Sequence, residues 1–194
     1  MTKVEIPLGT AATAAQRICA ALLDSGTVVR AVPAGSIRRQ KPLVGDLEVV
    51  AELSDRFGSS AEIPRVLDQL GVSHGLPDAA GKRAPWGPRY YRARVPTNRA
   101  EFTLPLDLFV VMPPAEWPVI YLIRTGSARF SQAFVTRLHN YNLRTDEGRV
   151  LNGGNRPVHV ETEEDLFRLA HLPFLAPPQR DLELEGTRAL FERA

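Results

Sequence analysis

Residues 35–50 read GSIRRQKPLVGDLEVV, and this stretch decides how the chain is interpreted. A Gly-Ser turn and two arginines precede an apolar segment that carries two acids, Asp46 and Glu48. Alternate side chains of a β-strand share a face and lie about 6.6 Å apart along it. The two carboxylates are therefore predicted to point the same way, while Leu47 and Val49 enter a core. Adjacent carboxylates resist joint ionisation unless a cation lies between them, and Mg²⁺ prefers such oxygen ligands. The stretch predicts a strand that carries part of a metal site.

A third acid, Asp107, lies within the otherwise apolar segment Leu104–Val111. An ionised carboxylate buried there needs a partner, and a shared metal ion would supply one. Three carboxylates on two neighbouring strands can hold two metal ions, one for an attacking hydroxyl and one for leaving phosphates. The turn at Gly35–Ser36 and the following arginines would offer N–H groups, a hydroxyl and positive charge to a triphosphate. The simpler alternative is that Asp46 and Glu48 lie on the solvent-facing side of an edge strand and Asp107 caps a turn.

The composition is that of a globular protein. The chain has 194 residues, of which 44% are apolar and 24% charged. No apolar run approaches the roughly 20 residues that span a bilayer, and the first residues lack the apolar core of a signal peptide. With a single cysteine, no internal disulfide can form, so we expect an intracellular, cytoplasmic protein. We expect no membrane partner, and we expect a monomer.

Positive charge is concentrated in two segments, although the net charge is only +2. Residues 79–100 and 117–145 contain no acid. Such segments suggest a face that binds a polyanion, with arginines on phosphates and aromatic rings on bases. A solvated, Arg-rich surface is the alternative, with Tyr90 and Tyr91 lying one outside and one inside an ordinary strand. The candidate nucleic-acid-binding residues are Arg89, Tyr90, Arg92, Arg94 and Arg124.

Hydrophobic periodicity divides the chain into two parts at Pro113-Pro114. Before this point the pattern predicts helices and strands in mixed order, and after it mainly helices. We therefore expect an α+β domain over residues 1–113 and a smaller, mostly helical domain over residues 114–194. The predicted helices begin near residues 11, 62, 119, 130 and 162, and the predicted strands cover residues 28–32, 44–53 and 102–112.

Several segments in order along the chain resemble motifs of the X-family DNA polymerases, the polymerase beta type. The Gly-Ser turn with its arginines and the segment Gly45–Glu48 are similar to the nucleotidyltransferase signature of that family. Leu106–Leu108 resembles the strand that carries its third carboxylate. Two segments resemble the thumb, namely Arg124–Ser127, with its Thr-Gly-Ser turn, and Glu161–Phe167. The segment from Leu172 to Asp181 is similar to the closing motif of the family.

The resemblance implies a nucleotidyltransferase palm (residues 1–113) with a mixed β-sheet and helices, followed by a small, mostly helical thumb (residues 114–194), and it covers palm and thumb only. It implies two Mg²⁺ ions, or Mn²⁺, a dNTP substrate and a primer-template or gapped DNA. Asp46, Glu48 and Asp107 would be the catalytic metal ligands. The residues implied to bind the nucleotide are Gly35, Ser36, Arg39, Gly45, Thr125, Gly126 and Ser127.

The chain also departs from the family pattern. The second carboxylate, normally Asp, is Glu48, and we hypothesise that its extra methylene lowers activity or favours Mn²⁺, because Mg²⁺ tolerates little error in ligand position. An aromatic pair usually precedes the Thr-Gly-Ser turn, but Ile123 and Arg124 stand there. The polar residues that contact base and template in the family fall on Ala128, Ser131 and Val135 here. These departures predict weak sugar discrimination and low fidelity.

Three functions stay open on the sequence, and a fourth, a protein-modifying nucleotidyltransferase, is disfavoured by the thumb-like segments. The first is a DNA-directed polymerase that fills short gaps in DNA repair. The second is a template-relaxed terminal nucleotidyltransferase that acts on DNA or RNA ends. The third is a non-catalytic remnant that binds nucleic acid, which the retained acids disfavour. Extension of a single-stranded primer would separate the first two.

Overall fold

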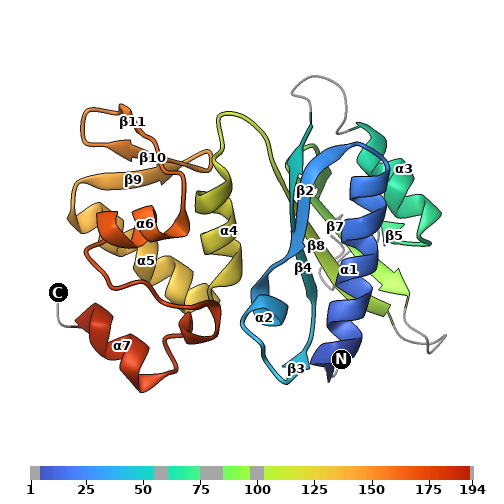
Figure 1. Ribbon diagram of the computed structural model, residues 1–194, viewed down its shortest axis with the longest axis horizontal. Helices are drawn as coiled ribbons and strands as arrows, with labels where there is room; N and C mark the ends of the chain where they lie inside the picture. The colour runs from blue at the N-terminus through green and yellow to red at the C-terminus, as the bar shows by residue number, and fades with distance from the viewer. Residues whose placement is uncertain (1–4, 55–60, 75–84, 97–102, 193–194) are drawn as a thin grey trace. The chain divides into compact units, whose positions relative to one another are not determined.

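The computed structural model describes residues 5–54, 61–74, 85–96 and 103–192 (Figure 1). The contacts divide the chain into two compact units. The first unit comprises Met1–Ile37 and Lys41–Met112, and the second comprises Arg38–Gln40 and Pro113–Ala194. The three residues Arg38–Gln40 thus belong by their contacts to the second unit, although they are inserted in the sequence of the first. In the described ranges, no helix is both long enough and apolar enough to cross a membrane.

The first unit is built on a mixed six-stranded sheet. Its central pair, β4 (Leu47–Leu53) and β8 (Thr103–Val111), is parallel, and all other pairs in the sheet are antiparallel. The strand order is β2-β4-β8-β7-β5, and β6 also pairs with β7. This mixed sheet confirms the predicted α+β class. The remaining strands of the sheet are β2 (Val28–Pro33), β5 (Ser73–His74), β6 (Trp86–Gly87) and β7 (Tyr90–Pro96).

Two helices, α1 (Leu8–Asp24) and α3 (Glu62–Gln69), pack on one face of this sheet (Figure 1). Along α1 the buried side chains recur every three or four residues, which places them on a single stripe. They meet alternate residues of β4 and β8, such as Val49 and Leu108, in one hydrophobic core. Because strand side chains alternate between faces, the residues between these core positions lie on the opposite face.

The predicted strand over residues 44–53 is interrupted in the structure. Leu43–Val44 form β3, which pairs with β1 (Ile6–Pro7), and β4 begins only at Leu47. The chain bends at residues 45 and 46, because the segments on either side of the bend pair with different sheets. A one-turn helix, α2 (Gly35–Arg38), connects β2 to this region.

The second unit has its own core, in which Phe130, Phe134 and Phe167 are buried side by side. Its helices are α4 (Trp117–Thr125), α5 (Ala128–Asn140), α6 (Glu163–Leu169) and α7 (Glu185–Glu192), with the 3₁₀ helix η2 (Pro177–Gln179). A three-stranded antiparallel sheet accompanies them, formed by β9 (Leu143–Asp146), β10 (Arg149–Asn152) and β11 (Pro157–Val158). The hydrophobic pattern did not predict these strands, since none is longer than four residues.

Helix α6 begins with a capping box at Thr162, where the sequence predicted a helix to begin. The Thr162 hydroxyl accepts from Asp165 N, and the Asp165 carboxylate accepts from Thr162 N. Hydrogen bonding with Thr162, chiefly from its backbone N–H to the carboxylate, lowers the pKa of Asp165 to about 2. The observed start of α6 therefore agrees with the start that the sequence predicted near residue 162.

Candidate active site

Glu48 and Asp107 are neighbours on the two parallel strands at the centre of the sheet. Their Cα atoms are register partners between β4 and β8, so both side chains lie on the face opposite α1 and α3. Asp107 is buried, with 8% of its surface exposed, and Glu48 is half-buried. Asp46 lies in the bend that leads into β4 and is also half-buried. The fold thus places two of the predicted acids side by side, and the third two residues before Glu48.

Asp107 has two partners on the next strand, one hydrogen-bond donor and one ion-pair partner. Tyr90 Oη donates to Asp107 Oδ1 at 2.5 Å, and Arg92 Nε lies 3.2 Å from the same oxygen. Arg92 is the register partner of Asp107 in the antiparallel pair of β7 and β8. Glu48, Asp107 and Arg92 therefore form a row across three strands. Sequence reasoning assigned Tyr90 and Arg92 to a nucleic-acid surface. Alternation along β7 shows only that they share a face, and the pairing of β7 with β8 places them beside the acid.

The Glu48 carboxylate lies against Gly35 at the start of α2. A Cβ atom built on Gly35 would overlap Glu48 Oε2, and the φ angle of Gly35 is +51°. Both observations require glycine here, because a side chain is disfavoured at this φ and would occupy the place of the carboxylate. The Gly-Ser turn and the second acid of the predicted site are therefore in direct contact.

We expect Gly35→Ala to lower the free energy of unfolding by about 1–2 kcal/mol, because the positive φ alone costs about that much. It should also displace the Glu48 carboxylate. Urea unfolding measures the first effect. Gly9→Ala is the matched control, since no atom lies within 4 Å of a Cβ there. Gly9 lies in α1, so the control should raise stability by about 0.5–1 kcal/mol. A shift of both variants in the same direction would contradict the role given to Gly35.

The three carboxylates do not yet converge on one point. Within the described ranges, no three His, Cys, Asp or Glu side chains stand close enough together to hold a metal ion. The donor set nevertheless fits a hard cation, because it consists of carboxylate oxygens, two of them on one sheet face and the third in the bend that leads into β4. In this structure Asp107 contacts Tyr90 and Arg92, and Glu48 lies against Gly35. Asp46, Glu48 and Asp107 are the residues that could hold divalent ions.

Two buried polar atoms near the Gly-Ser turn lack partners within the described part of the chain. They are Ser36 Oγ in the first unit and Arg39 Nε in the second. Arg39 also donates from Nη1 to the backbone oxygen of Thr125 at 2.6 Å. Buried polar atoms are normally hydrogen-bonded, and an exception points to a missing ligand or water. A hydroxyl and a guanidinium N–H are both suitable donors to phosphate oxygens.

In the second unit, Thr125, Gly126 and Ser127 connect α4 to α5. The Thr125 hydroxyl donates to Tyr121 O at 2.6 Å, and the Ser127 hydroxyl accepts from Phe130 N as the N-cap of α5. A side chain on Gly126 would overlap the Phe130 ring. These three residues thus have a structural role at the helix junction, which is compatible with backbone contacts to a ligand.

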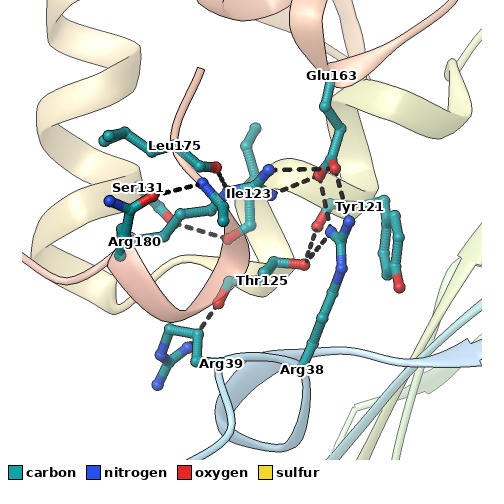
Figure 2. A network of polar contacts seen from close by, with 11 residues as sticks. Arg38, Arg39, Tyr121, Ile123, Thr125, Ser131, Glu163, Leu175 and Arg180 are labelled. Carbon is teal, nitrogen blue, oxygen red and sulfur yellow. Dashed lines mark hydrogen bonds and ion pairs between the residues drawn. The ribbon is translucent and has the colours of Figure 1, made fainter. Parts of the chain in front are cut away.

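A buried ionic network links this junction to α6 and to the end of the chain (Figure 2). Glu163 accepts from Arg38 at 2.6 and 2.7 Å and from Arg180 at 2.6 and 3.2 Å. Arg38 Nη1 also donates to the Thr125 hydroxyl at 2.7 Å, and its guanidinium lies 3.6 Å from the centre of the Tyr121 ring. Sequence reasoning placed Glu163 in the thumb-like segment Glu161–Phe167 and gave it no individual role. No local sequence pattern identified Arg38 and Arg180 as the partners of Glu163.

Burial alone would raise the pKa of Glu163. The hydrogen bonds from Arg38 and Arg180 and their positive charges outweigh burial, so the pKa lies below the ordinary value. Glu163 is therefore held as a carboxylate. Its two arginines are correspondingly held in place, and the guanidinium of Arg180 has no exposed surface.

Side chains alternate along β7 as an ordinary strand requires. Tyr91 is buried in the core, whereas Tyr90, Arg92 and Arg94 lie on the opposite face. Arg94 donates to Thr103 Oγ1 at 3.3 Å. The other predicted nucleic-acid contacts, Arg89 in the turn before β7 and Arg124 near the end of α4, are exposed. Lys82, Arg83 and Arg99 of the basic segment lie outside the described residues.

The fold of this chain is similar to that of solved structures. One is Leishmania infantum polymerase beta in its ternary P/T complex, with a TM-score of 0.75 and 17% sequence identity over 92% of this chain and 77% of that one. The same polymerase in its ternary gap complex gives a TM-score of 0.76 and 16% identity over 91% of this chain and 71% of that one. This chain has a polymerase beta-like fold. No family model and no curated protein matches its sequence, so the likeness concerns the fold.

Proposed function

We propose that the protein is a DNA-directed DNA polymerase of the X-family type, which transfers nucleotides to a primer 3′-hydroxyl and fills short gaps in DNA repair with low fidelity. One observation carries the proposal. Glu48 and Asp107 are in register on neighbouring parallel strands and on one sheet face, with the Gly35 turn against Glu48. This arrangement suits phosphoryl chemistry, in which positioning and charge stabilisation supply most of the rate. The likeness to polymerase beta agrees with it.

In this proposal Asp46, Glu48 and Asp107 hold two Mg²⁺ ions, or Mn²⁺, which would supply charge stabilisation and a more acidic 3′-hydroxyl. Asp107 orients that hydroxyl and accepts its proton. Ser36 and Arg39, whose buried donors lack partners in the described chain, bind the β- and γ-phosphates. Gly45 and the residues from Thr125 to Ser127 shape the remainder of the dNTP site through the backbone.

Residues 1–113 would form the palm and residues 114–194 the thumb. The Leishmania polymerase beta structures were solved as P/T and gap complexes, and this supports DNA as the partner here. The exposed arginines at positions 89, 94 and 124 would contact the DNA backbone. Their contribution should fall as salt rises.

Primer extension on three DNA substrates tests the proposal. A one-nucleotide gap, an open primer-template and a single-stranded primer are each supplied with dNTPs or rNTPs, in Mg²⁺ and in Mn²⁺. We expect metal-dependent extension that is fastest on the gap and follows the template base. Extension of the single-stranded primer at a similar rate would favour the terminal transferase. DNA binding without extension in either metal would favour the non-catalytic remnant.

A further inference from the structure

The Asp107 carboxylate accepts both of its contacts from β7 through a single oxygen. Tyr90 Oη and Arg92 Nε both meet Oδ1, at 2.5 and 3.2 Å. The Tyr90 hydroxyl takes one lone-pair position of this oxygen by a hydrogen bond, and the Arg92 guanidinium lies against the same atom as an ion-pair partner. A cation that takes Asp107 through this oxygen therefore competes with both contacts.

The side chains of Tyr90 and Arg92 differ in how firmly the surrounding structure holds them in place. The Tyr90 ring stacks on Phe109, with ring centres 5.0 Å apart and planes at 4°, so its hydroxyl is directed at Asp107 by packing. The Arg92 side chain is 50% exposed, whereas that of Asp107 is 11% exposed. An ion pair with one exposed partner is weakly held, so Arg92 can leave for solvent while Tyr90 stays near the acid.

We propose that Tyr90 and Arg92 are positioning residues that form a clamp on Asp107, and that a divalent cation competes with this clamp for the Asp107 carboxylate. The inference rests on the proposed function, because it takes Asp107 to be a metal ligand. When only a fraction of molecules has the competent arrangement, the apparent affinity for a ligand falls by that fraction. The clamp therefore weakens metal binding and keeps the acid ordered without the metal.

Titration with Mn²⁺ alone, in the absence of DNA and nucleotide, tests the clamp. The paramagnetic resonance signal of free Mn²⁺ gives the dissociation constant. Arg92→Ala removes one donor, and Tyr90→Phe removes only the hydroxyl and keeps the stacked ring. We expect each variant to bind Mn²⁺ about five- to tenfold more tightly than the wild type, since hydrogen bonds to charged groups are among the stronger ones.

Arg94→Ala is the matched control. It removes the same charge from the same face of β7, but Arg94 donates to Thr103 and not to an acid. We expect less than a twofold change for this variant. Equal tightening by Arg92→Ala and Arg94→Ala would show a general charge effect and would overturn the clamp.

The Asp107→Asn variant tests the proposed function independently of the clamp, because it shows whether Asp107 is a metal ligand. If this variant binds Mn²⁺ as the wild type does, Asp107 is not a metal ligand, and the clamp fails together with the proposed metal site. If it binds Mn²⁺ more weakly, while Arg92→Ala and Tyr90→Phe bind as the wild type or more weakly, the clamp alone fails. Weaker binding by Asp107→Asn with tighter binding by the two clamp variants supports both.

Discussion

Asp107→Asn is expected to lower the single-turnover rate of nucleotide addition on gapped DNA by on the order of 10³-fold or more. Asp107 is proposed both as metal ligand and as the group that takes the proton of the 3′-hydroxyl. Loss of a positioned general base alone costs about 10²–10⁴-fold. The asparagine keeps the shape of the side chain and an oxygen that can accept from Tyr90, so the fold should survive.

Glu52→Gln is the control for this substitution. Glu52 lies near the end of β4, on the same face as Glu48, and pairs with Arg30 at a distance of 3.5 Å. Its loss removes one negative charge from the same sheet face without touching the three acids. We expect near wild-type rates for this variant, and thermal unfolding of both variants should stay close to that of the wild type. Retained extension by Asp107→Asn would refute the catalytic assignment.

Local patterns in the sequence predicted the elements that carry the acids. An apolar run with a single acid indicated the strand of Asp107, and the structure has β8 over Thr103–Val111. Alternation also indicated that Tyr90 and Tyr91 could face opposite ways, as they do. Side chains alternate between the two faces of a strand every two residues, so this pattern can be recognised within a short stretch of sequence.

Contacts between distant segments were not predictable in the same way. The register that sets Glu48 beside Asp107 depends on which strands become neighbours, and no spacing within either strand contains this information. The same holds for Arg92 opposite Asp107. Gly35 was read as a phosphate-binding turn, but its contact with Glu48 depends on the path of the chain between α2 and β4.

The buried network in the second unit is the clearest case of a feature hidden from local reasoning. An acid at the start of a helix is explained by the helix dipole, so nothing required a further role for Glu163. In the structure this residue bridges two arginines that come from opposite ends of the sequence (Figure 2). Its neighbour Glu164 is exposed on the same first helical turn and has the role that the sequence suggested for both.

Glu163→Gln is expected to lower the free energy of unfolding of the second unit by about 3–5 kcal/mol, the usual cost of removing one partner of a buried ion pair. The Glu163 side chain is 11% exposed, that of Arg180 is fully buried and that of Arg38 is 19% exposed. The substitution therefore leaves two largely desolvated guanidinium groups without a counter-charge. Urea unfolding at neutral pH measures the loss. Glu164→Gln, which removes the same charge from the same turn, should cost less than about 1 kcal/mol.

The pH dependence of this difference tests its electrostatic origin. Because the pKa of Glu163 is lower in the folded protein than its ordinary 4.5, its contribution is fully present above that ordinary value. It is lost as the pH falls through the depressed folded value. The gap in stability between wild type and Glu163→Gln should therefore be constant from neutral pH down to about pH 5 and shrink in more acidic solution. A gap that stays the same at acidic pH would mean that packing, and not the charge of Glu163, holds the two arginines.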